Sequence, residues 1–285
     1  MTRGRFLKRI AREILGEDKA SLIWGRIEII GDIAVIRIPF GLEPKELKPL
    51  AERILEEFKY IRSVWGGLPG VSGPYRLRPF VHLAGEKRSE TVYREHGCLF
   101  KVDITRVYVS PTLNYEHRRI ARLVRSGEVI TNMFAGAGFF SIIAAKLSRP
   151  RKVYSIDINP DAYRYMVENV KLNKVEDIVE PILGDAAKVI MERLQSTSDR
   201  VLMPYPELAL DYLRYAVMAI RNCGWIHVYL HIGADKGGNP YEKAKNMVAD
   251  ALNSLVKKYS FGIIRKVRAV KPRTYQIVVD VFIEK

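Results

Sequence analysis

The sequence predicts an α/β protein with two parts. The larger is a Rossmann-like domain, in which a doubly wound, mostly parallel sheet carries helices on both faces, and the smaller is an N-terminal α/β domain. Three observations predict this fold. Strand-like and helical patterns alternate from residue 129 onward, a glycine-rich loop follows the first of those strands, and a separate α/β pattern ends at a Gly/Pro-rich loop, residues 66–74.

The composition is that of a globular protein. Of the 285 residues, 48% are hydrophobic and 28% are charged, so the chain can bury one large core or two moderate ones. No apolar run reaches the roughly 18 to 20 residues of a membrane span, and the arginine-rich N-terminus has no apolar signal core. We therefore expect a cytoplasmic protein that does not enter a membrane.

The net charge of +15 and the isoelectric point near 9.7 indicate a polyanionic partner, nucleic acid first, because clustered Lys and Arg displace phosphate counterions. The alternative is the charged surface of a heat-adapted protein, which also fits the scarcity of glutamine. Cys98 and Cys223 are too few for a disulfide scaffold or a zinc cluster, and we expect buried free thiols. No metal is predicted.

The N-terminal sequence pattern predicts a basic amphipathic helix within residues 1–24 and then a small α/β domain over residues 25–95. Hydrophobicity alternates on both sides of Gly31-Asp32, which predicts a hairpin over 26–38. Pro44 opens a helical pattern that runs to Phe58, and a strand-like run follows at 61–65. Strand-like runs at 80–83, 90–94 and 99–109 predict a sheet that leads into the second domain.

Residues 96–285 predict the Rossmann-like domain. A cationic helical pattern over 115–125 precedes a strand at 129–133. Further strands are predicted at 152–157, 178–183, 199–203, 224–231, 260–269 and 274–283. In such a sheet ligands bind at the carboxyl ends of the strands, and the glycine-rich loop lies at one of these ends.

The glycine-rich loop predicts a nucleotide-cofactor site. It contains Phe134, Ala135, Gly136 and Gly138 and leads from a strand into a helix. Glycines let the backbone approach a ligand, and the start of the helix offers unpaired N–H groups. Because Gly-rich loops are common, the residues downstream decide which cofactor binds.

Two acidic residues follow neighbouring strands. Asp157 lies about 20 residues after Gly138, where a carboxylate can accept hydrogen bonds from both ribose hydroxyls; capping the turn before the next helix is the alternative. Asp185 can accept from an adenine amine or act as an N-cap. Since the loop is not G-x-G-x-x-G, S-adenosylmethionine is favoured over NAD. The flanking Ile158 and Ala186, and Met203 at the end of a later strand, complete the predicted cofactor contacts.

Four segments resemble the archaeal and eukaryotic tRNA (guanine-37, N1)-methyltransferases and their wyosine-pathway relatives. They are Tyr75-Arg76-Leu77-Arg78, Val107-Tyr108-Val109-Ser110-Pro111, Met133 to Gly138, and Ile156-Asp157-Ile158-Asn159-Pro160. The resemblance covers roughly residues 25–285. It implies a class I methyltransferase domain preceded by a small α/β domain, which agrees with the division predicted from periodicity.

The resemblance also implies catalytic roles for Glu116 and Arg76. Guanine N1 carries a proton at neutral pH, so Glu116 would take that proton while Arg76 donates to O6 as negative charge develops there. Without the resemblance, Glu116 is better explained as an ion-pair partner on a helix and Arg76 as a phosphate contact. The resemblance reverses that preference.

The chain departs from the family after the fourth core strand. Relatives commonly have Met-Asn-Leu-Pro, whose amide holds the target base, whereas this chain has Met203-Pro204-Tyr205-Pro206. Pro204 has no side-chain donor, so backbone carbonyls, stacking on Tyr205 or another residue would have to hold the base, unless both prolines only make a turn rigid. This form resembles an archaeal subgroup that methylates both guanine-37 N1 and carbon 7 of the tricyclic wyosine precursor, 4-demethylwyosine.

RNA contacts are expected from cations and from stacking aromatics. The splayed-out base would stack on Tyr108 or Tyr205, although either tyrosine alone is more typical of a core. The cationic candidates are Arg3, Arg5, Lys8, Arg9, Arg76, Arg78, Lys87, Arg88, Arg118, Arg119, Arg122, Lys271 and Arg273. Relatives also carry an N-terminal domain that reads the tRNA outer corner, whereas about 24 residues precede the small domain here.

The predicted function is that of a monomeric, S-adenosylmethionine-dependent tRNA methyltransferase. It would form N1-methylguanosine at position 37 in the anticodon loop, with C7 methylation of 4-demethylwyosine as a second activity. The alternatives are a wyosine-pathway aminocarboxypropyl transferase, and a non-catalytic tRNA-binding protein that keeps the methyltransferase fold.

Overall fold

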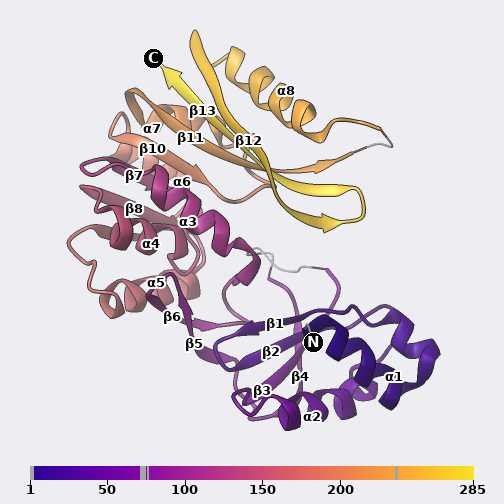
Figure 1. The fold of residues 1–285 in the computed structure, drawn as a ribbon. Coiled ribbons are helices and arrows are strands. Elements are labelled where there is room, and N and C mark those ends of the chain that lie inside the picture. Colours follow the sequence, from indigo (N-terminus) through magenta and orange to yellow (C-terminus); the bar gives the residue numbers. More distant parts are fainter. Residues whose placement is uncertain (1–2, 71–74, 76, 235–236) are drawn as a thin grey trace. The chain divides into compact units, whose positions relative to one another are not determined.

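The structure is a computed structural model that describes residues 3–70, 75, 77–234 and 237–285 (Figure 1). It divides into two compact units, residues 1–111 and residues 112–285. The boundary expected from the sequence, between residues 95 and 96, falls at the end of a strand in the first unit. Among the described helices none is long and apolar enough to cross a membrane.

The first unit contains a four-stranded sheet with the order β1-β2-β3-β4. Its strands are β1 (Ile27–Ile30), β2 (Ile33–Arg37), β3 (Ser63–Gly67) and β4 (Phe80–Gly85). The β1–β2 hairpin is confirmed, and Gly31 supplies the positive φ of +57° that its turn requires. Strands β2 and β3 are parallel and are connected through the 3₁₀ turn Pro44–Leu47 and helix α2 (Lys48–Glu57).

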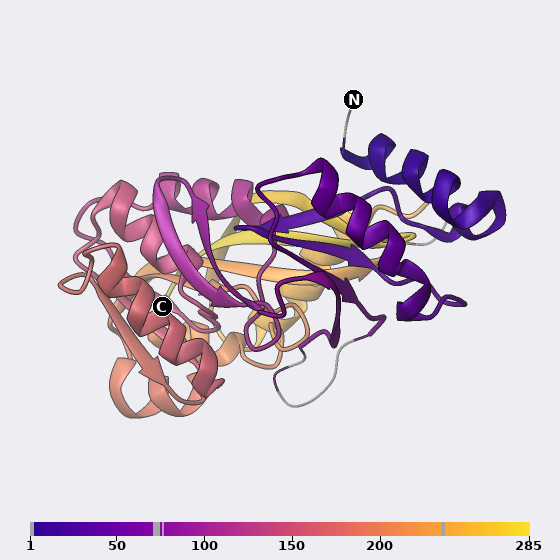
Figure 2. The same cartoon turned by 90° about the horizontal axis from the view of Figure 1, so that it is seen from below.

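The predicted N-terminal helix is α1 (Arg3–Leu22), which is interrupted at Gly16. Helices α1 and α2 lie side by side and share one apolar core with the four-stranded sheet (Figure 2). Leu7 and Ile10 of α1 and Leu50 and Ile54 of α2 are fully buried in that core. Burial of these side chains fixes both helices on the small sheet.

The predicted run from residue 80 to residue 109 does not form one sheet. Strands β5 (Glu90–Glu95) and β6 (Cys98–Asp103) form a separate antiparallel hairpin. The strand expected to reach residue 109 ends at Asp103, because the Asp103 carboxylate accepts hydrogen bonds from both the N–H and the hydroxyl of Thr105 and so closes a turn. Cys98 is buried as expected, whereas Cys223 is exposed.

The second unit is built on a seven-stranded sheet with the order β12-β13-β11-β10-β7-β8-β9. Strands β7 (Val129–Asn132), β8 (Lys152–Asp157), β9 (Val179–Leu183), β10 (Ser198–Met203) and β11 (Ile220–Gly233) are parallel. Strand β13 (Thr274–Glu284) pairs antiparallel with both β11 and β12 (Lys258–Lys271). The predicted mostly parallel sheet is therefore confirmed.

Helices cover this sheet as the alternating pattern predicts. They are α3 (Asn114–Leu123), α4 (Phe139–Ser148), α5 (Pro160–Leu172), α6 (Ala186–Val189), α7 (Leu213–Ala219) and α8 (Pro240–Asn253). Helices α6, α7 and α8 pack into one apolar cluster with alternate residues of β10, β11 and β13. The side chains between those residues project to the opposite face, against which α3 packs.

This alternation positions the site. Val228 and Leu230 of β11 belong to the apolar cluster, so His227 and Tyr229 face α3. Val279 and Val281 of β13 also belong to the apolar cluster. Asp280 lies between them and therefore faces α3 as well. Polar side chains from two neighbouring strands are thus brought under one helix.

Candidate active site

The glycine-rich loop connects the end of β7 to the start of α4, as predicted. The amide N–H of Ala135 donates to the carbonyl of Ile156 at 2.8 Å, which ties the loop to β8. Gly138 has φ +93° and is the N-cap of α4. The N-terminus of α4 therefore opens directly from the loop, which is the arrangement that favours polar and anionic ligand groups.

The two glycines of the loop have different roles. A side chain at Gly136 would meet no other heavy atom within 4 Å, so the loop borders open space there. A Cβ atom at Gly138 would lie 2.9 Å from Cδ1 of Ile142 and 3.2 Å from Cγ of Met166. Gly136 thus leaves room for a ligand, whereas Gly138 permits close packing of the loop on α4 and α5.

Asp157 at the end of β8 holds the loop and the following turn. Its Oδ2 accepts from the N–H of Gly136 at 2.6 Å, and its Oδ1 accepts from the N–H of Asn159 at 2.9 Å. Burial raises the pKa of the Asp157 carboxyl, and hydrogen bonds from backbone amides oppose that shift without cancelling it. The N–H of Ile158 also hydrogen-bonds to this carboxylate, which can accept about four hydrogen bonds and so keeps acceptor capacity for a ligand hydroxyl.

An exposed apolar side chain stands beside this carboxylate. Ile158 is 56% exposed although it follows a core strand, and so offers a flat apolar contact next to Asp157. Asn159 caps α5 by accepting from the N–H of Asp161, and Pro160 is the first helical residue. The turn that carries Ile158 is therefore fixed at both ends.

Asp185 is an N-cap, which was one of its two predicted roles. Its Oδ1 accepts from the N–H of Lys188 at 3.1 Å, and its Oδ2 accepts from the hydroxyl of Tyr212 at 2.6 Å. Tyr212 also contacts the Phe134 ring edge-on, with ring centroids 5.5 Å apart. Asp185 is thereby joined to the glycine-rich loop through one aromatic side chain.

The segment after β10 lies beside the same ring. Met203 is fully buried at the end of β10, and Pro204, Tyr205 and Pro206 follow it as half-buried residues. The Tyr205 ring packs edge-on against Phe134 at a centroid distance of 5.4 Å. Ala186, the first residue of α6, is also buried. The structure therefore brings most of the predicted cofactor residues to one edge of the sheet.

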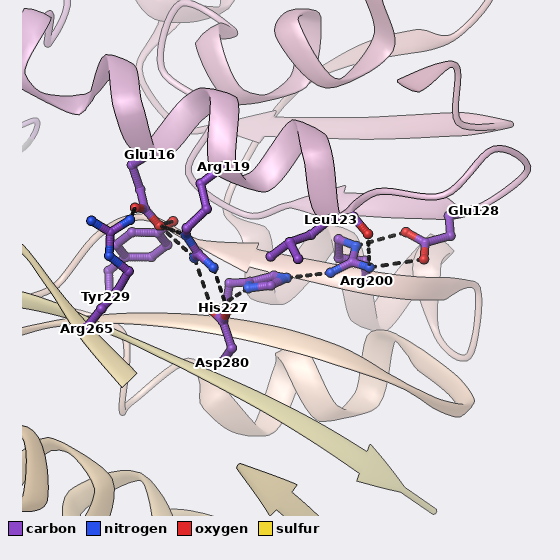
Figure 3. A network of polar contacts seen from close by, with 9 residues as sticks. All are labelled: Glu116, Arg119, Leu123, Glu128, Arg200, His227, Tyr229, Arg265 and Asp280. Carbon is purple, nitrogen blue, oxygen red and sulfur yellow. Dashed lines mark hydrogen bonds and ion pairs between the residues drawn. The ribbon is translucent and has the colours of Figure 1, made fainter. Parts of the chain in front are cut away.

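Glu116 of α3 is buried, at 1% exposure, and does not lie on the helix surface. Its Oε1 accepts from Nε of Arg119 at 2.7 Å and from the hydroxyl of Tyr229 at 2.9 Å, and it lies 2.6 Å from Nη2 of Arg119. Its Oε2 accepts from Nη1 of Arg265 at 3.3 Å. Figure 3 shows these groups converging on the carboxylate from α3, β11 and β12.

The network continues below Glu116 through Arg119. Arg119 donates to both oxygens of Asp280, at 2.6 Å and 3.2 Å. Asp280 also contacts Nδ1 of His227 at 2.6 Å, and Nε2 of His227 lies 2.7 Å from Nη1 of Arg200. Because a guanidinium only donates, Nε2 of His227 is the acceptor and its Nδ1–H donates to Asp280.

Arg200 ends the network at the far end of α3 (Figure 3). It donates to the carbonyl of Leu123, one of the last carbonyls of the helix, and to both oxygens of Glu128. The network thus contains three carboxylates, Glu116, Glu128 and Asp280, and three guanidiniums, Arg119, Arg200 and Arg265. Equal numbers of opposite charges make burial of the network tolerable.

Protonation states in the network follow from burial and neighbours. Burial lowers the pKa of His227, so its ring is neutral. Burial alone would raise the pKa of Asp280, but His227 and Arg119 outweigh it and hold that pKa at about 2. Burial and then Glu116 raise the pKa of Tyr229 well above its usual range, so its hydroxyl stays protonated and donates.

Two aromatic contacts connect Glu116 to the glycine-rich loop. His117, the neighbour of Glu116, stacks on Phe139 at 5.5 Å and meets Phe140 edge-on at 4.4 Å. Phe139 is the first residue of α4, directly after Gly138. The Phe140 ring also contacts Tyr229, a hydrogen-bond donor to Glu116. The carboxylate and the loop therefore belong to one packed assembly.

Some predicted residues have a different place. The expectation that Arg119 contacts RNA is wrong: its side chain is 9% exposed and is ion-paired with Glu116 and Asp280. Tyr108 is 52% exposed and belongs to the first unit. Arg76 lies outside the described residues. Its predicted role and that of Tyr108 stay predictions.

Sequence reasoning missed Tyr229 and Arg265 as partners of Glu116, and Asp280 as the second carboxylate that pairs with Arg119. Asp280 and Tyr229 had a signal, since each interrupts a run of apolar residues in a predicted strand at a position where one face should be buried. Arg265 had none, because a cation on an edge strand is common.

Comparison with known proteins agrees with this geometry. Residues 91–255 match the model of the TRM5/TYW2 methyltransferase domain, and residues 7–88 match that of the TYW2 N-terminal domain. The tRNA 4-demethylwyosine(37)-methyltransferase Taw21 of Saccharolobus solfataricus is 48% identical over 259 residues, which is 91% of this chain and 94% of that protein. The tRNA (guanine(37)-N(1))-methyltransferase Trm5b of Pyrococcus abyssi is 37% identical over 89% of this chain and 73% of its own length.

Solved structures give the same relationship. The complex of aTrm5 with tRNALeu superposes with a TM-score of 0.83 and 31% identity, over 97% of this chain and 77% of that one. The Methanocaldococcus jannaschii TYW2 structure in complex with AdoMet superposes with a TM-score of 0.68 and 27% identity, over 91% of this chain and all of that one. The family model, the relatives and the fold agree. The chain belongs to the TRM5/TYW2 methyltransferase family.

Proposed function

We propose that this chain is an S-adenosylmethionine-dependent tRNA methyltransferase that acts on the base at position 37, with 4-demethylwyosine as its substrate and carbon 7 as the methylated atom. The observation that carries this choice is the 48% identity to Taw21, which extends over 94% of that protein. Sequence reasoning put N1-methylguanosine first. The end-to-end likeness reverses that order.

S-adenosylmethionine, when bound, supplies a methyl group on a positively charged sulfur. The loop Phe134 to Gly138 would hold it, with open space over Gly136, and Asp157 would accept from its ribose hydroxyls. The exposed Ile158 would contact its adenine, beside Asp185, Ala186 and Met203. These residues fit the group, because acceptors, an apolar contact and a helix N-terminus are present at one edge of the sheet.

Glu116 is the proposed proton acceptor. A bond forms between carbon 7 and the methyl carbon, the methyl–sulfur bond breaks, and the proton on carbon 7 passes to the carboxylate while its electron pair returns to the ring. Arg119 and Tyr229 hold Oε1 of Glu116, whereas Oε2 accepts one longer hydrogen bond, from Arg265, and would face the substrate. Arg76 would donate to the oxo group of the base, as the resemblance implies.

The segment Met203 to Pro206 and Tyr108 are the proposed base-binding residues. Pro204 stands where relatives have an amide, so the ring of Tyr205 and the backbone carbonyls would hold the base. Loss of a base-gripping side chain suits a tricyclic base, which is larger than guanine. Stacking is tolerant of such enlargement because it uses the flat face of the base.

N1 methylation of guanosine 37 is the second candidate, supported by the likeness to Trm5b. Carbon 7 of the tricycle is bonded to the nitrogen that was N1 of guanine, so the two reacting atoms are neighbours on one edge of the base. A carboxylate that takes the proton from one position is within reach of the other.

Product analysis tests the proposal. The protein and S-adenosylmethionine are incubated with tRNA that carries 4-demethylwyosine at position 37 and, separately, with tRNA that carries guanosine 37, and digested nucleosides are identified by mass spectrometry. A C7-methylated tricycle is expected, with N1-methylguanosine if the second candidate also holds. An aminocarboxypropyl product, or no product from either tRNA, would contradict the proposal.

A further inference from the structure

Arg265 is the only partner of Glu116 that is both cationic and within reach of solvent in the part of the chain that the structure describes. Its side chain is 30% exposed, compared with 9% for Arg119, and Glu116 itself is 1% exposed. Burial and Asp280 fix Arg119 in the core, whereas Arg265 projects from the edge strand β12. Arg265 is therefore the cationic partner of Glu116 that a base arriving from solvent can contact.

The two oxygens of Glu116 are not equivalent. Oε1 is occupied by Arg119 and the Tyr229 hydroxyl, at 2.6 to 2.9 Å. Among the described residues, Oε2 has Arg265 alone, at the longer distance of 3.3 Å. An oxygen that accepts one long hydrogen bond keeps a lone pair for a further proton donor, so Oε2 is the atom available for the substrate.

Arg265 is oriented by an aromatic ring. Its guanidinium carbon lies 4.4 Å from the centroid of the Tyr115 ring, and Tyr115 precedes Glu116 on α3. This cation–π contact restrains the guanidinium beside the carboxylate and leaves several of its five N–H donors unused by Glu116.

The pair therefore presents a hydrogen-bond acceptor next to a donor. The reacting edge of the target base presents the opposite order, a proton to be removed next to an oxo group, and this holds for guanine and for the tricycle. We propose that Arg265 is a further catalytic residue, which donates to the oxo group of the target base while Oε2 of Glu116 takes the neighbouring proton.

This role rests on the proposed function and adds a residue that the family resemblance did not supply. For guanine, Arg265 would stabilise the negative charge that develops on O6 as the N1 proton leaves. For the tricycle, it would fix the edge of the base so that carbon 7 faces Glu116. In both cases the loss of Arg265 affects the chemical step more than tRNA affinity.

Arg268 supplies the matched control. Arg265 pairs with Val278 of β13, and Arg268 pairs with Gln276. Because these two partners are two residues apart, both arginines lie on the same face of β12. Arg268 donates to Gln276 and to Thr112, and it is not among the partners of Glu116 that the structure describes. Arg268→Gln removes the same charge from the same strand without altering the carboxylate.

The experiment uses the full chain and whichever of the two tRNAs the unsubstituted protein methylates. Single-turnover rate constants at saturating tRNA and S-adenosylmethionine, tRNA dissociation constants, and thermal midpoints are measured for Arg265→Gln, Arg265→Lys and Arg268→Gln. We expect Arg265→Gln to lower the rate constant about 100-fold and to change tRNA affinity by less than about twofold. Arg265→Lys should have a rate constant about tenfold higher than Arg265→Gln, since lysine restores the charge but not the planar, two-pronged donor geometry of the guanidinium.

Three results would overturn the inference: an unchanged rate constant in Arg265→Gln, an effect on tRNA affinity alone, or an equal loss in Arg268→Gln. If Arg265→Gln does not fold, Arg265→Lys decides, and a rate equal to that of the unsubstituted protein counts against the inference. Failure of the unsubstituted protein to methylate either tRNA would instead refute the proposed function, and this inference with it.

Discussion

Replacing Asp280 by Asn tests whether the buried network under α3 stabilises the fold as its geometry implies. Asp280 accepts from Arg119 through both oxygens and contacts His227 through one. Asn keeps the shape but replaces one oxygen by an NH₂ group, which then faces an N–H donor. Arg119 loses the charge of one of its two carboxylate partners and remains buried.

The expected cost follows from the carboxyl's pKa. It falls from 3.8 to about 2, which corresponds to about 2 kcal/mol in favour of the charged form, at roughly 1.36 kcal/mol per pKa unit. Breaking a buried ion pair by removing one partner typically costs about 3 to 5 kcal/mol. We expect Asp280→Asn to lower the free energy of unfolding of the second unit by about 3 kcal/mol at pH 7.

The sign of the pH dependence is also fixed. Because the folded pKa lies below the unfolded value, the stabilisation is present above about pH 3.8 and is lost as pH falls through about 2. The contribution of the Asp280 carboxyl to the difference between the two proteins should therefore shrink below about pH 4.

Urea unfolding followed by tryptophan fluorescence measures this difference. Trp225 is the one tryptophan in residues 112–285, so a Trp24→Phe/Trp65→Phe background for both proteins reports the second unit alone. Asp250→Asn, an exposed position on α8, is the control and should change stability by less than about 0.5 kcal/mol. A loss below about 1 kcal/mol for Asp280→Asn would refute the view that the network is energetically coupled.

Three further predictions follow from the site. Gly138→Ala should lower the free energy of unfolding of the second unit by about 2 kcal/mol, because the new Cβ meets Ile142. Gly136→Ala should lower it by only about 1 kcal/mol but should weaken S-adenosylmethionine binding, measured by calorimetry, about tenfold. Equal effects of the two substitutions would contradict the assigned roles. Pro204→Asn should raise the ratio of N1-methylguanosine to C7-methylated tricycle in digested tRNA, and an unchanged ratio would remove Pro204 from base selection. Burial lowers the pKa of His227 below 6.5, so the stability that the neutral ring contributes is present above that pH and is lost as pH falls. NMR at pH 6 should therefore find the ring neutral, with its proton on Nδ1. A charged ring at pH 6 would contradict the network.

Much of the fold could be predicted because it depends on local periodicity. All seven strands of the large sheet overlap with predicted runs. The extent of the strand after residue 98 was missed, because a side-chain turn at Asp103 overrides a continuing apolar pattern.

The site was predictable only in part. Gly136 and Asp157 lie close in sequence, on consecutive strand ends, so their contact follows from topology. Two partners of Glu116 come from β11 and β12, and the second carboxylate that pairs with Arg119 comes from β13, all more than 100 residues away. Which residue of each strand meets α3 depends on sheet register, and a shift of one residue would turn Tyr229 and Asp280 to the other face.

The central claim is that the buried Glu116 takes the proton from base 37 during methyl transfer. Single-turnover methylation by Glu116→Gln, with deuterated methyl donor and mass-spectrometric detection on the tRNA, tests it most directly, with calorimetric S-adenosylmethionine binding measured on the same samples. We expect Glu116→Gln to lower the rate constant at least about 100-fold and to keep S-adenosylmethionine affinity within about twofold of that of the unsubstituted protein. A rate constant close to that of the unsubstituted protein would contradict it.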